Sequence, residues 1–251
     1  MTQSRTPTPC WLDPEALEIV FPDVELALQE PDGLLAVGGK LSTEWLLHAY
    51  QRGVFPWYGQ DQPILWWAPD PRLVLFPENL HVSHSLARVI KRGKFTVTLD
   101  TAFTDVITAC ARPRPSQAGT WITPEMKSAY VDLHHAGHAH SVESWCDGVL
   151  AGGLYGIAIG NIFFGESMFT EVADASKTAF ITLVRQLERW GFTLIDCQVH
   201  TDHLASLGAA PVSRKEFTAL LERGCQQPDR RQPWMFDEHP GLTGSRGDQK
   251  S

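Results

Sequence analysis

The segment from residue 149 to residue 198 constrains the fold most, because strand, turn, strand, helix and strand patterns follow one another without a gap. The dipeptide Gly160-Asn161 separates two apolar runs, VLAGGLYGIAI and IFFGES, which is typical of a hairpin. From residue 173 to 190 apolar residues recur at helical spacing, and either Asp174 or Ser176 can cap that helix. The strand FTLIDCQV follows at once, so the segment predicts a ββαβ unit.

Three polar side chains in this unit are candidates for chemistry. Asp196 and Gln198 are two residues apart in the last strand, so they should project from the same face of the sheet. Glu166 is the single acid at the end of the second apolar run. Taken alone, an acid at the end of a hairpin is equally compatible with a solvated surface position. We nevertheless expect the reactive groups of the protein in this unit.

Caps, stops and alternation predict further elements on both sides of the ββαβ unit. Ser42 should cap one helix, and Thr123 followed by Pro124 should begin another. Asp100 is expected to cap a helix over residues 101–112. The unit's first two strands should belong to a three-stranded meander whose other hairpin turn is Asp147-Gly148. The remaining expected elements are strands at 73–79 and 95–100 and helices at 84–94 and 216–224.

A dense group of aromatic residues and prolines, FPWY at 55–58 and LWWAPDPR at 65–72, indicates a join between two domains. We predict a small N-terminal α/β domain over residues 1–70 and a larger domain over residues 71–225. The tail over residues 226–251 is polar and contains Pro and Gly, so it should be disordered or loosely attached. The predicted fold class is α+β.

Composition limits the class of protein. Of the 251 residues, 43% are hydrophobic and 20% are charged, which is close to soluble-protein averages and argues against a disordered or fibrous chain. No apolar run reaches membrane-spanning length and the N-terminus lacks signal-peptide features, so we expect a cytoplasmic protein with no membrane partner. Five scattered cysteines without a C-x-x-C pair should be reduced thiols. The net charge of -8 argues against broad nonspecific nucleic-acid binding but allows a local basic patch.

Several clusters suggest other sites that the surrounding residues do not favour. The histidines at 134, 135, 138, 140, 200 and 203 have no Cys or acid at ligand spacing, so we expect no metal site. Cys197 lies near His200, but strand alternation should turn the thiol away from the face that carries Asp196 and Gln198, which disfavours a thiol nucleophile. By spacing alone, the helix at 84–94 presents a solvated basic face. Its cations are Arg88, Lys91, Arg92 and Lys94.

The strand and helix order also matches the N-acetyltransferases, which use acyl-CoA. A coenzyme A site normally has a glycine-bearing loop before the central helix, so that backbone N–H groups can approach the pyrophosphate. Here the loop ESMFTEVADASK contains no glycine, and its acids Glu171 and Asp174 would repel phosphate. Acyl-CoA therefore fits poorly, and we expect no cofactor.

Blocks along residues 21–217 closely resemble the leucyl/phenylalanyl-tRNA–protein transferases of bacteria, in that family's order. The matching blocks are EPDGLLAVGGKLS, AYQRGVFPWY, PILWWAPDPR, GTWIT, LHHAGHAHSVESW, GGLYG, FFGESMF, ASKTA and LIDCQVHTDHLASLGA. The resemblance implies that the larger domain is acetyltransferase-like (GNAT-type), with a mixed, mostly antiparallel sheet flanked by helices. It also implies an aminoacyl-tRNA donor in place of acyl-CoA, which agrees with the glycine-free loop.

The resemblance further implies transfer of Leu or Phe, sometimes Met, from a charged tRNA to the N-terminal Arg or Lys of an acceptor protein, which marks that protein for degradation. In this family Asp196 would orient Gln198 near the attacking amine, and Glu166 would hold an ammonium group. Whether these groups or the tRNA ribose take the proton stays open. The acyl pocket would consist of Leu154, Phe163, Phe180, Leu183 and Ile195. The tRNA 3′-adenosine would stack on Trp57 and Trp121 with Tyr50 nearby, and the acceptor-stem phosphates would contact Arg88, Lys91, Arg92 and Lys94.

Two other functions stay open beside this enzyme. One is a tRNA-dependent aminoacyltransferase of the kind that builds peptidoglycan bridges, and the other is a tRNA-binding module without catalysis. A binding module has no need for the Asp196 and Gln198 pair or for an adjoining apolar pocket, so the enzyme is favoured. We expect it to act as a monomer.

Overall fold

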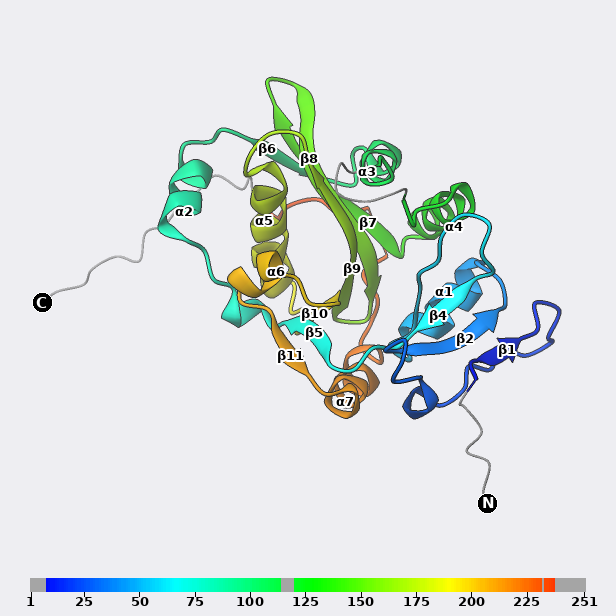
Figure 1. Ribbon diagram of the computed structural model, residues 1–251. Coiled ribbons are helices and arrows are strands. Elements are labelled where there is room, and N and C mark those ends of the chain that lie inside the picture. The colour runs from blue at the N-terminus through cyan, green and yellow to red at the C-terminus, as the bar shows by residue number, and fades with distance from the viewer. Residues whose placement is uncertain (1–7, 114–119, 232, 238–251) are drawn as a thin grey trace, which may run out of the picture.

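The chain forms two β-sheets with helices around them (Figure 1). The computed structural model describes residues 8–113, 120–231 and 233–237. Along the chain, the last strand of the smaller sheet ends at Trp67 and the first strand of the larger sheet begins at Arg72. We keep the proposed domain boundary at residues 70 and 71.

The smaller sheet is built from the N-terminal part of the chain, in the strand order β1-β2-β4-β3. β1 pairs parallel with β2, and the other pairs are antiparallel. Helix α1 (Thr43–Tyr50) lies beside it and begins where predicted, because the Ser42 side chain accepts a hydrogen bond from Trp45 N. The other elements of this part are β1 (Cys10–Leu12), η1 (Val24–Leu26), β2 (Leu34–Gly38), β3 (Phe55–Pro56) and β4 (Leu65–Trp67).

The larger sheet has the strand order β11-β5-β10-β9-β8-β7-β6. Neighbouring strands in the described part of the chain are antiparallel, except for the parallel pair β9 and β10. This mixed, mostly antiparallel sheet confirms the predicted α+β class, including the meander of β7, β8 and β9. The strands are β5 (Arg72–Leu75), β6 (Thr96–Leu99), β7 (Ala139–Cys146), β8 (Val149–Ile159), β9 (Ile162–Thr170), β10 (Leu194–Gln198) and β11 (Ala210–Val212).

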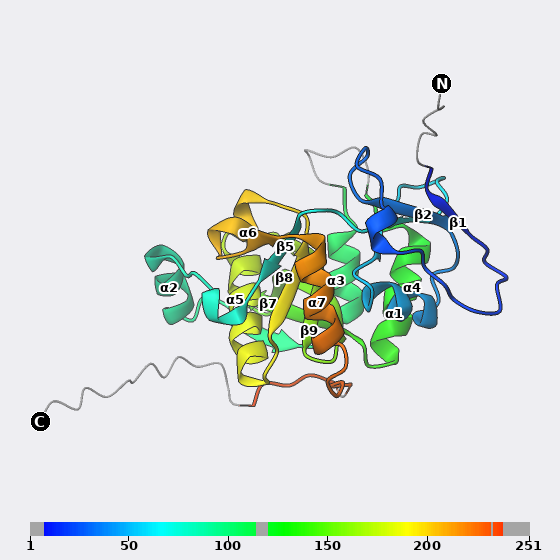
Figure 2. The ribbon, with the colours of Figure 1, turned by 90° about the horizontal axis from the view of Figure 1, so that it is seen from below.

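Helices cover both faces of the larger sheet (Figures 1 and 2). The crossover helix α5 packs on one face, and α3 and α4 pack on the other, toward the smaller sheet. The two larger apolar cores of the described residues lie one on each side of the sheet. The helices are α2 (His84–Lys91), α3 (Phe103–Cys110), α4 (Pro124–His135), α5 (Ala175–Arg189), α6 (Asp202–Ser206) and α7 (Arg214–Gly224), and the short 3-10 turn is η2 (Pro77–Asn79).

The predicted cap at Asp100 is wrong, whereas the cap at Thr123 is confirmed. Asp100 instead accepts hydrogen bonds from the backbone N–H groups of Ser141 and Trp234. These donors hold its carboxylate at the edge of β7, away from α3. The N-cap of α3 is Ala102, whose N–H donates to Glu143 Oε1.

The C-terminal tail is also different from the prediction, because its described part, up to residue 237, packs against the larger domain. Trp234 is buried, with 1% of its surface exposed, and its ring stacks on the His140 ring with 3.8 Å between the ring centroids. The same ring meets Trp190 and Phe192 edge-on. The burial of this one large aromatic residue therefore holds the segment against the larger domain, although the segment's polar composition predicted disorder. The remainder of the tail, residues 238–251, lies outside the described residues.

Removal of this aromatic anchor should destabilise the larger domain. We expect Trp234→Ala to lower the free energy of unfolding by about 3–5 kcal/mol, because a fully buried Trp leaves a large cavity. Urea unfolding followed by circular dichroism measures the change. Met235→Ala is the matched control, since Met235 is 76% exposed one residue further along, and it should unfold like the wild type. Equal stability of the Trp234 and Met235 variants would contradict a structural role for the tail.

Candidate active site

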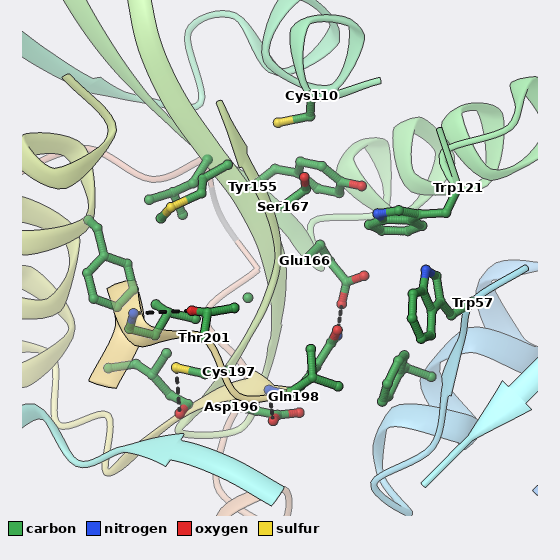
Figure 3. Close-up of a pocket in the computed structure, with 18 of the residues that line it drawn as sticks. Trp57, Cys110, Trp121, Tyr155, Glu166, Ser167, Asp196, Cys197, Gln198 and Thr201 are labelled. Atoms are coloured by element: carbon green, nitrogen blue, oxygen red, sulfur yellow. Dashed lines mark hydrogen bonds between the residues drawn. The ribbon is translucent and has the colours of Figure 1, made fainter. Parts of the chain in front are cut away.

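A cavity of about 280 Å³ opens where β9 and β10 separate. The two strands pair only from Leu194 to Asp196, opposite Ile162 to Phe164. Beyond that point β9 continues alongside β8, while β10 ends in a bulge, so the space between the two strands becomes the cavity. Figure 3 shows Glu166 and Gln198 pointing toward each other in this space. The ββαβ unit thus forms one part of the cavity wall, and residues from the smaller sheet and from the segments around Trp121 and α6 contribute to the rest.

Glu166 is the centre of a hydrogen-bond cluster in the cavity wall. Tyr50 donates to its Oε1 at 2.7 Å, Tyr130 donates to its Oε2 at 2.7 Å, and Gln198 Nε2 donates to Oε1 at 3.0 Å. The hydroxyls of Tyr50 and Tyr130 are themselves 2.6 Å apart. Two hydroxyl hydrogens serve only two of these three contacts at a time. A proton on Glu166 would satisfy all three if Glu166 donated to one tyrosine, that tyrosine donated to the other, and the second donated back to Glu166.

The surroundings of Glu166 bring its titration close to neutrality. Burial raises the pKa of Glu166 from 4.5 to about 7, and the negative charge of Asp196 acts in the same direction. The hydroxyls of Tyr130 and Tyr50 and the charge of Arg72 act in the opposite direction. A carboxyl group with this pKa can take up and release a proton near pH 7, as a general base must.

Gln198 has a backbone conformation that residues other than glycine rarely adopt, with φ of 61°. It follows the β-bulge at Cys197, where β10 shifts register against β5. Its N–H donates to Asp196 Oδ1 at 2.8 Å, which fixes this turn of the backbone. The predicted pairing of Asp196 with Gln198 therefore exists, but it runs through the backbone of Gln198 and leaves its amide free to reach Glu166.

Asp196 is held in a buried ion pair with Arg72. Arg72 Nε donates to Oδ1 at 2.8 Å and Nη2 donates to Oδ2 at 2.7 Å, a bidentate arrangement with both side chains inaccessible to solvent. Both carboxylate oxygens are thus occupied. Asp196 also lines the cavity, and its place in the site, with Gln198 as the residue that it would orient, stays a prediction.

Cys197 belongs to the opposite face of β10, as strand alternation predicts. It packs in the core beside α5 and also lines the cavity, and its Sγ donates to Ile195 O. Burial, followed by the negative charge of Asp196, raises the pKa of the Cys197 thiol well above its ordinary value. Because the thiolate is the nucleophilic form, these surroundings disfavour a thiol mechanism.

The apolar end of the cavity contains four of the five residues predicted for the acyl pocket. Leu154, Phe163, Phe180 and Ile195 line the cavity, and Met168 adds a flexible side chain to the same wall. Leu183 does not line it. Leu183 lies one helical turn further along α5 and is fully buried in the core behind the pocket. It supports the pocket from behind, so its predicted direct contact with the acyl group is corrected.

The open end of the cavity has two tryptophans on its rim. Trp57 and Trp121 both line the cavity, and Trp57 is 43% exposed (Figure 3). Tyr50 does not join them. It is fully buried, its ring meets Phe164 edge-on and its hydroxyl bonds to Glu166, so no face of the ring is free to stack on a base. Tyr50 therefore belongs to the Glu166 cluster.

The predicted basic helix, α2, is separate from the cavity. In both views it lies beyond α5, on the side away from the smaller sheet (Figures 1 and 2). Its charged side chains are exposed, and they do not line the cavity. They are Arg88, Lys91, Arg92 and Lys94.

Two functional residues, Arg72 and Tyr130, were missed by the sequence analysis. A signal for Arg72 existed, because an arginine that begins the apolar run RLVLF and an aspartate within LIDCQ are both charges in buried strands, which need partners. Tyr130 gave no such signal. It lies on a helix and reads as an ordinary core aromatic until Glu166 is placed against it.

Two histidines of the predicted cluster have structural partners. His140 Nδ1 lies 2.8 Å from Asp100 Oδ2, and His134 Nδ1 lies 2.8 Å from Ala139 O while its ring stacks on Phe103. Within residues 8–113, 120–231 and 233–237, no three His, Cys, Asp or Glu side chains gather closely enough to hold a metal ion.

Comparisons with known proteins agree with this geometry. The sequence profile of the leucyl/phenylalanyl-tRNA protein transferase family matches residues 74–222, and the profile of that family's N-terminal domain matches residues 39–70. The chain belongs to this family. It is therefore an aminoacyltransferase, and the transferase family implies aminoacyl-tRNA and protein as substrates.

Several relatives named leucyl/phenylalanyl-tRNA–protein transferase align over most of the chain. The protein from Anaeromyxobacter sp. is 60% identical over 221 residues, which cover 88% of this chain and 93% of the relative. The protein from Aromatoleum aromaticum is 61% identical over 201 residues, which cover 80% and 85%. The protein from Azotobacter vinelandii is also 61% identical over 201 residues, which cover 80% and 89%.

Solved structures with a similar chain path are more distant. L-PGS from Bacillus licheniformis is 11% identical, with a TM-score of 0.38 over 65% of this chain and 55% of that one. A GCN5-related N-acetyltransferase from Kribbella flavida is 16% identical, with a TM-score of 0.33 over 64% of this chain and 57% of that one.

Among the described residues, none of the helices has the length and apolar character that a membrane span requires.

The raised pKa of Glu166 predicts how stability depends on pH. The folded protein keeps a proton on Glu166 up to about pH 7, whereas the unfolded chain loses it near 4.5. The folded state therefore binds more protons across this window, and Glu166 lowers the free energy of unfolding as pH rises through it. Relative to wild type, Glu166→Gln should gain stability from pH 4.5 to 7 and then level off.

Urea unfolding of both proteins at a series of pH values measures this difference. The comparison isolates Glu166, because every other titrating group is present in both proteins. A difference in unfolding free energy that stays constant with pH would show that Glu166 titrates normally in the folded state.

Proposed function

We propose that the protein transfers Leu or Phe, and also Met, from aminoacyl-tRNA to the N-terminal Arg or Lys of acceptor proteins. The transfer would mark those proteins for degradation through their new N-terminal residue. One observation carries the proposal, namely that the Glu166 and Gln198 pair lies between an apolar pocket and a rim formed by Trp57 and Trp121. An aminoacyl ester linked to a terminal adenosine has the same order of parts, with a side chain, a reactive carbonyl and a base.

The reaction is aminolysis of an activated ester. The α-amine nitrogen of the acceptor attacks the ester carbonyl carbon, a C–N bond forms, and the bond from that carbon to the ribose oxygen breaks. The amine loses one proton and the ribose oxygen gains one, so no outside reactant is consumed. A free α-amine has a pKa of about 8, so only modest base assistance is required beyond positioning.

Gln198 is suited to orient the attacking amine. Its Nε2 donates to Glu166, so its Oε1 is the amide atom that remains to accept a hydrogen bond from the amine N–H. A neutral amide is too weak a base to take the proton. Gln198 thus supplies direction, and the proton has to go elsewhere.

Glu166 is the proton acceptor that we propose. Tyr50, Tyr130 and Gln198 use three acceptor positions on the carboxylate. A carboxylate offers about four such positions, so one remains for the amine, on Oε2. Its pKa of about 7 allows it to accept the amine proton and return it to the leaving ribose oxygen. The rate should accordingly rise with pH as Glu166 ionises.

The remaining substrate contacts follow from the two ends of the cavity. The apolar end, with Leu154, Phe163, Phe180 and Ile195, can select among hydrophobic side chains by shape, which is worth about 1–3 kcal/mol per methylene-sized difference. Trp57 and Trp121 can stack on the terminal adenosine. We also propose that the cations of α2 contact acceptor-stem phosphates, and that the protein works as a monomer in the cytoplasm, where charged tRNA is made.

Gln198→Ala tests the catalytic assignment. The protein is incubated with labelled Leu-tRNA and a peptide that begins with Arg, and label on the peptide is counted. The variant should fold normally but lose most transfer, because the amine is no longer directed at the carbonyl. Met235→Ala serves as the matched surface control and should transfer like wild type. If wild type labels no peptide with any charged tRNA, a binding module would replace the enzyme; label on peptidoglycan precursors alone would favour a peptidoglycan-bridge transferase.

Two donors separate the adenosine contact from the phosphate contacts. Trp57→Ala should raise KM for both a minimal aminoacyl-adenosine and the full aminoacyl-tRNA, because both contain the terminal base. Replacement of Arg88, Lys91, Arg92 and Lys94 by Gln should raise KM for the full tRNA alone and flatten its dependence on salt. An unchanged KM in the Trp57 variant would show that Trp57 contributes to packing and does not contact the adenosine. A higher KM for both donors in the α2 variant would refute the acceptor-stem contact.

A further inference from the structure

Arg72 takes no step in the proposed aminolysis, yet it joins three parts of the molecule at the strand that carries Gln198. Beyond its two hydrogen bonds to Asp196, its Nη1 donates to Gly53 O at 3.1 Å, at the end of α1 in the smaller domain. The guanidinium lies between the rings of Phe55 and Phe217, 4.7 Å from each centroid. These contacts restrict the position and the plane of the guanidinium.

The position of Asp196 decides the backbone of Gln198. Asp196 Oδ1 accepts both from Arg72 Nε and from Gln198 N, so a single oxygen connects the guanidinium to the left-handed residue. A left-handed conformation at a residue other than glycine is unfavourable and persists only where the surroundings hold it. Here the surroundings that hold it are the ion pair and, at the other end of the side chain, Glu166.

We infer that Arg72 is a positioning residue for aminoacyl transfer, acting through Asp196 on the backbone of Gln198 and so on the direction of its amide. The contact to Gly53 O makes this support span the two domains, so the domain that carries Trp57 also braces the strand that carries Gln198. The inference rests on the proposed role of Gln198 in the transfer reaction. It assigns a function to a residue that touches neither substrate.

Arg72→Lys is the sharpest test, because lysine keeps the charge but cannot form the bidentate fork. We expect kcat for Leu transfer to fall about tenfold to 100-fold, as expected when a catalytic group shifts by about 1 Å, with little change in KM for aminoacyl-tRNA. The fold, followed by circular dichroism, should be retained. The same kcat as wild type in a folded Arg72→Lys protein would overturn the inference.

Arg214→Lys is the matched control for a general loss of stability. Arg214 is another mostly buried arginine between the two domains, where it donates to Ala68 O and pairs with Glu25, but it has no contact with Asp196. It should lose stability as Arg72→Lys does and keep its kcat. An equal fall of kcat in both variants would show that Arg72 acts through domain stability alone.

A double-mutant cycle tests whether Arg72 acts through Asp196. Asp196→Asn should lower kcat by itself, and adding Arg72→Lys to it should cost much less than Arg72→Lys costs in wild type. Independent, multiplied losses would contradict the proposed route.

The pH profile adds a second readout, because the negative charge of Asp196 contributes to the raised pKa of Glu166. Asp196→Asn should move the midpoint of kcat/KM to lower pH, whereas Arg72→Lys should leave it in place.

A variant with both charges removed covers the case in which Arg72→Lys does not fold. Replacement of a buried ion pair by apolar residues is often neutral or stabilising, so Arg72→Met with Asp196→Leu should fold. The inference predicts a low kcat even in this stable protein, because nothing accepts the Gln198 N–H, and a wild-type kcat would refute it. Wild-type protein without any transfer activity would instead refute the proposed function, before the question of Arg72 arises.

Discussion

The ion pair between Arg72 and Asp196 is the contact on which the geometry of the cavity depends. Two charges removed from water gain little net stability, because their desolvation offsets most of their attraction. What the pair contributes is direction, since a planar guanidinium with three hydrogen-bonded acceptor atoms and a ring on each side has one available position. That position fixes Asp196, and Asp196 fixes the bulged end of β10.

The separation of β9 from β10 then creates the space in which this direction matters. If β9 and β10 stayed paired, backbone hydrogen bonds would fill the space between them. Because the strands separate, the side chains of Glu166 and Gln198 meet across the gap. Burial raises the pKa of Glu166 to about 7, and two tyrosine hydroxyls hold its carboxyl group. The same gap that admits a substrate thus also places a proton acceptor beside the proposed path of the amine.

Much of this could be predicted from the sequence, for identifiable reasons. The turn at Gly160-Asn161, the cap at Thr123 and the alternation of β10 depend on neighbouring residues, and the structure agrees with all three. The predictions for Asp100 and the tail failed, and the hydrogen bond of Tyr50 to Glu166 was not foreseen, because each depends on a distant partner. Asp100 accepts hydrogen bonds from β7 and the tail, and Trp234 stacks on His140. Tyr50 donates to Glu166, which lies 116 residues away in the sequence.

By itself, the sequence determined the order of elements, the class of fold, the family and four of the five residues predicted for the acyl pocket, because periodicity, turn chemistry and motif order are local properties. Only the tertiary structure decided what those residues do. It paired Asp196 with Arg72, and placed Leu183 in the core behind the pocket. It also gave Glu166 a pKa near neutrality. Burial, charge pairing and the remaining hydrogen-bond positions are set by side chains far apart in the chain, and those distances exist only after folding.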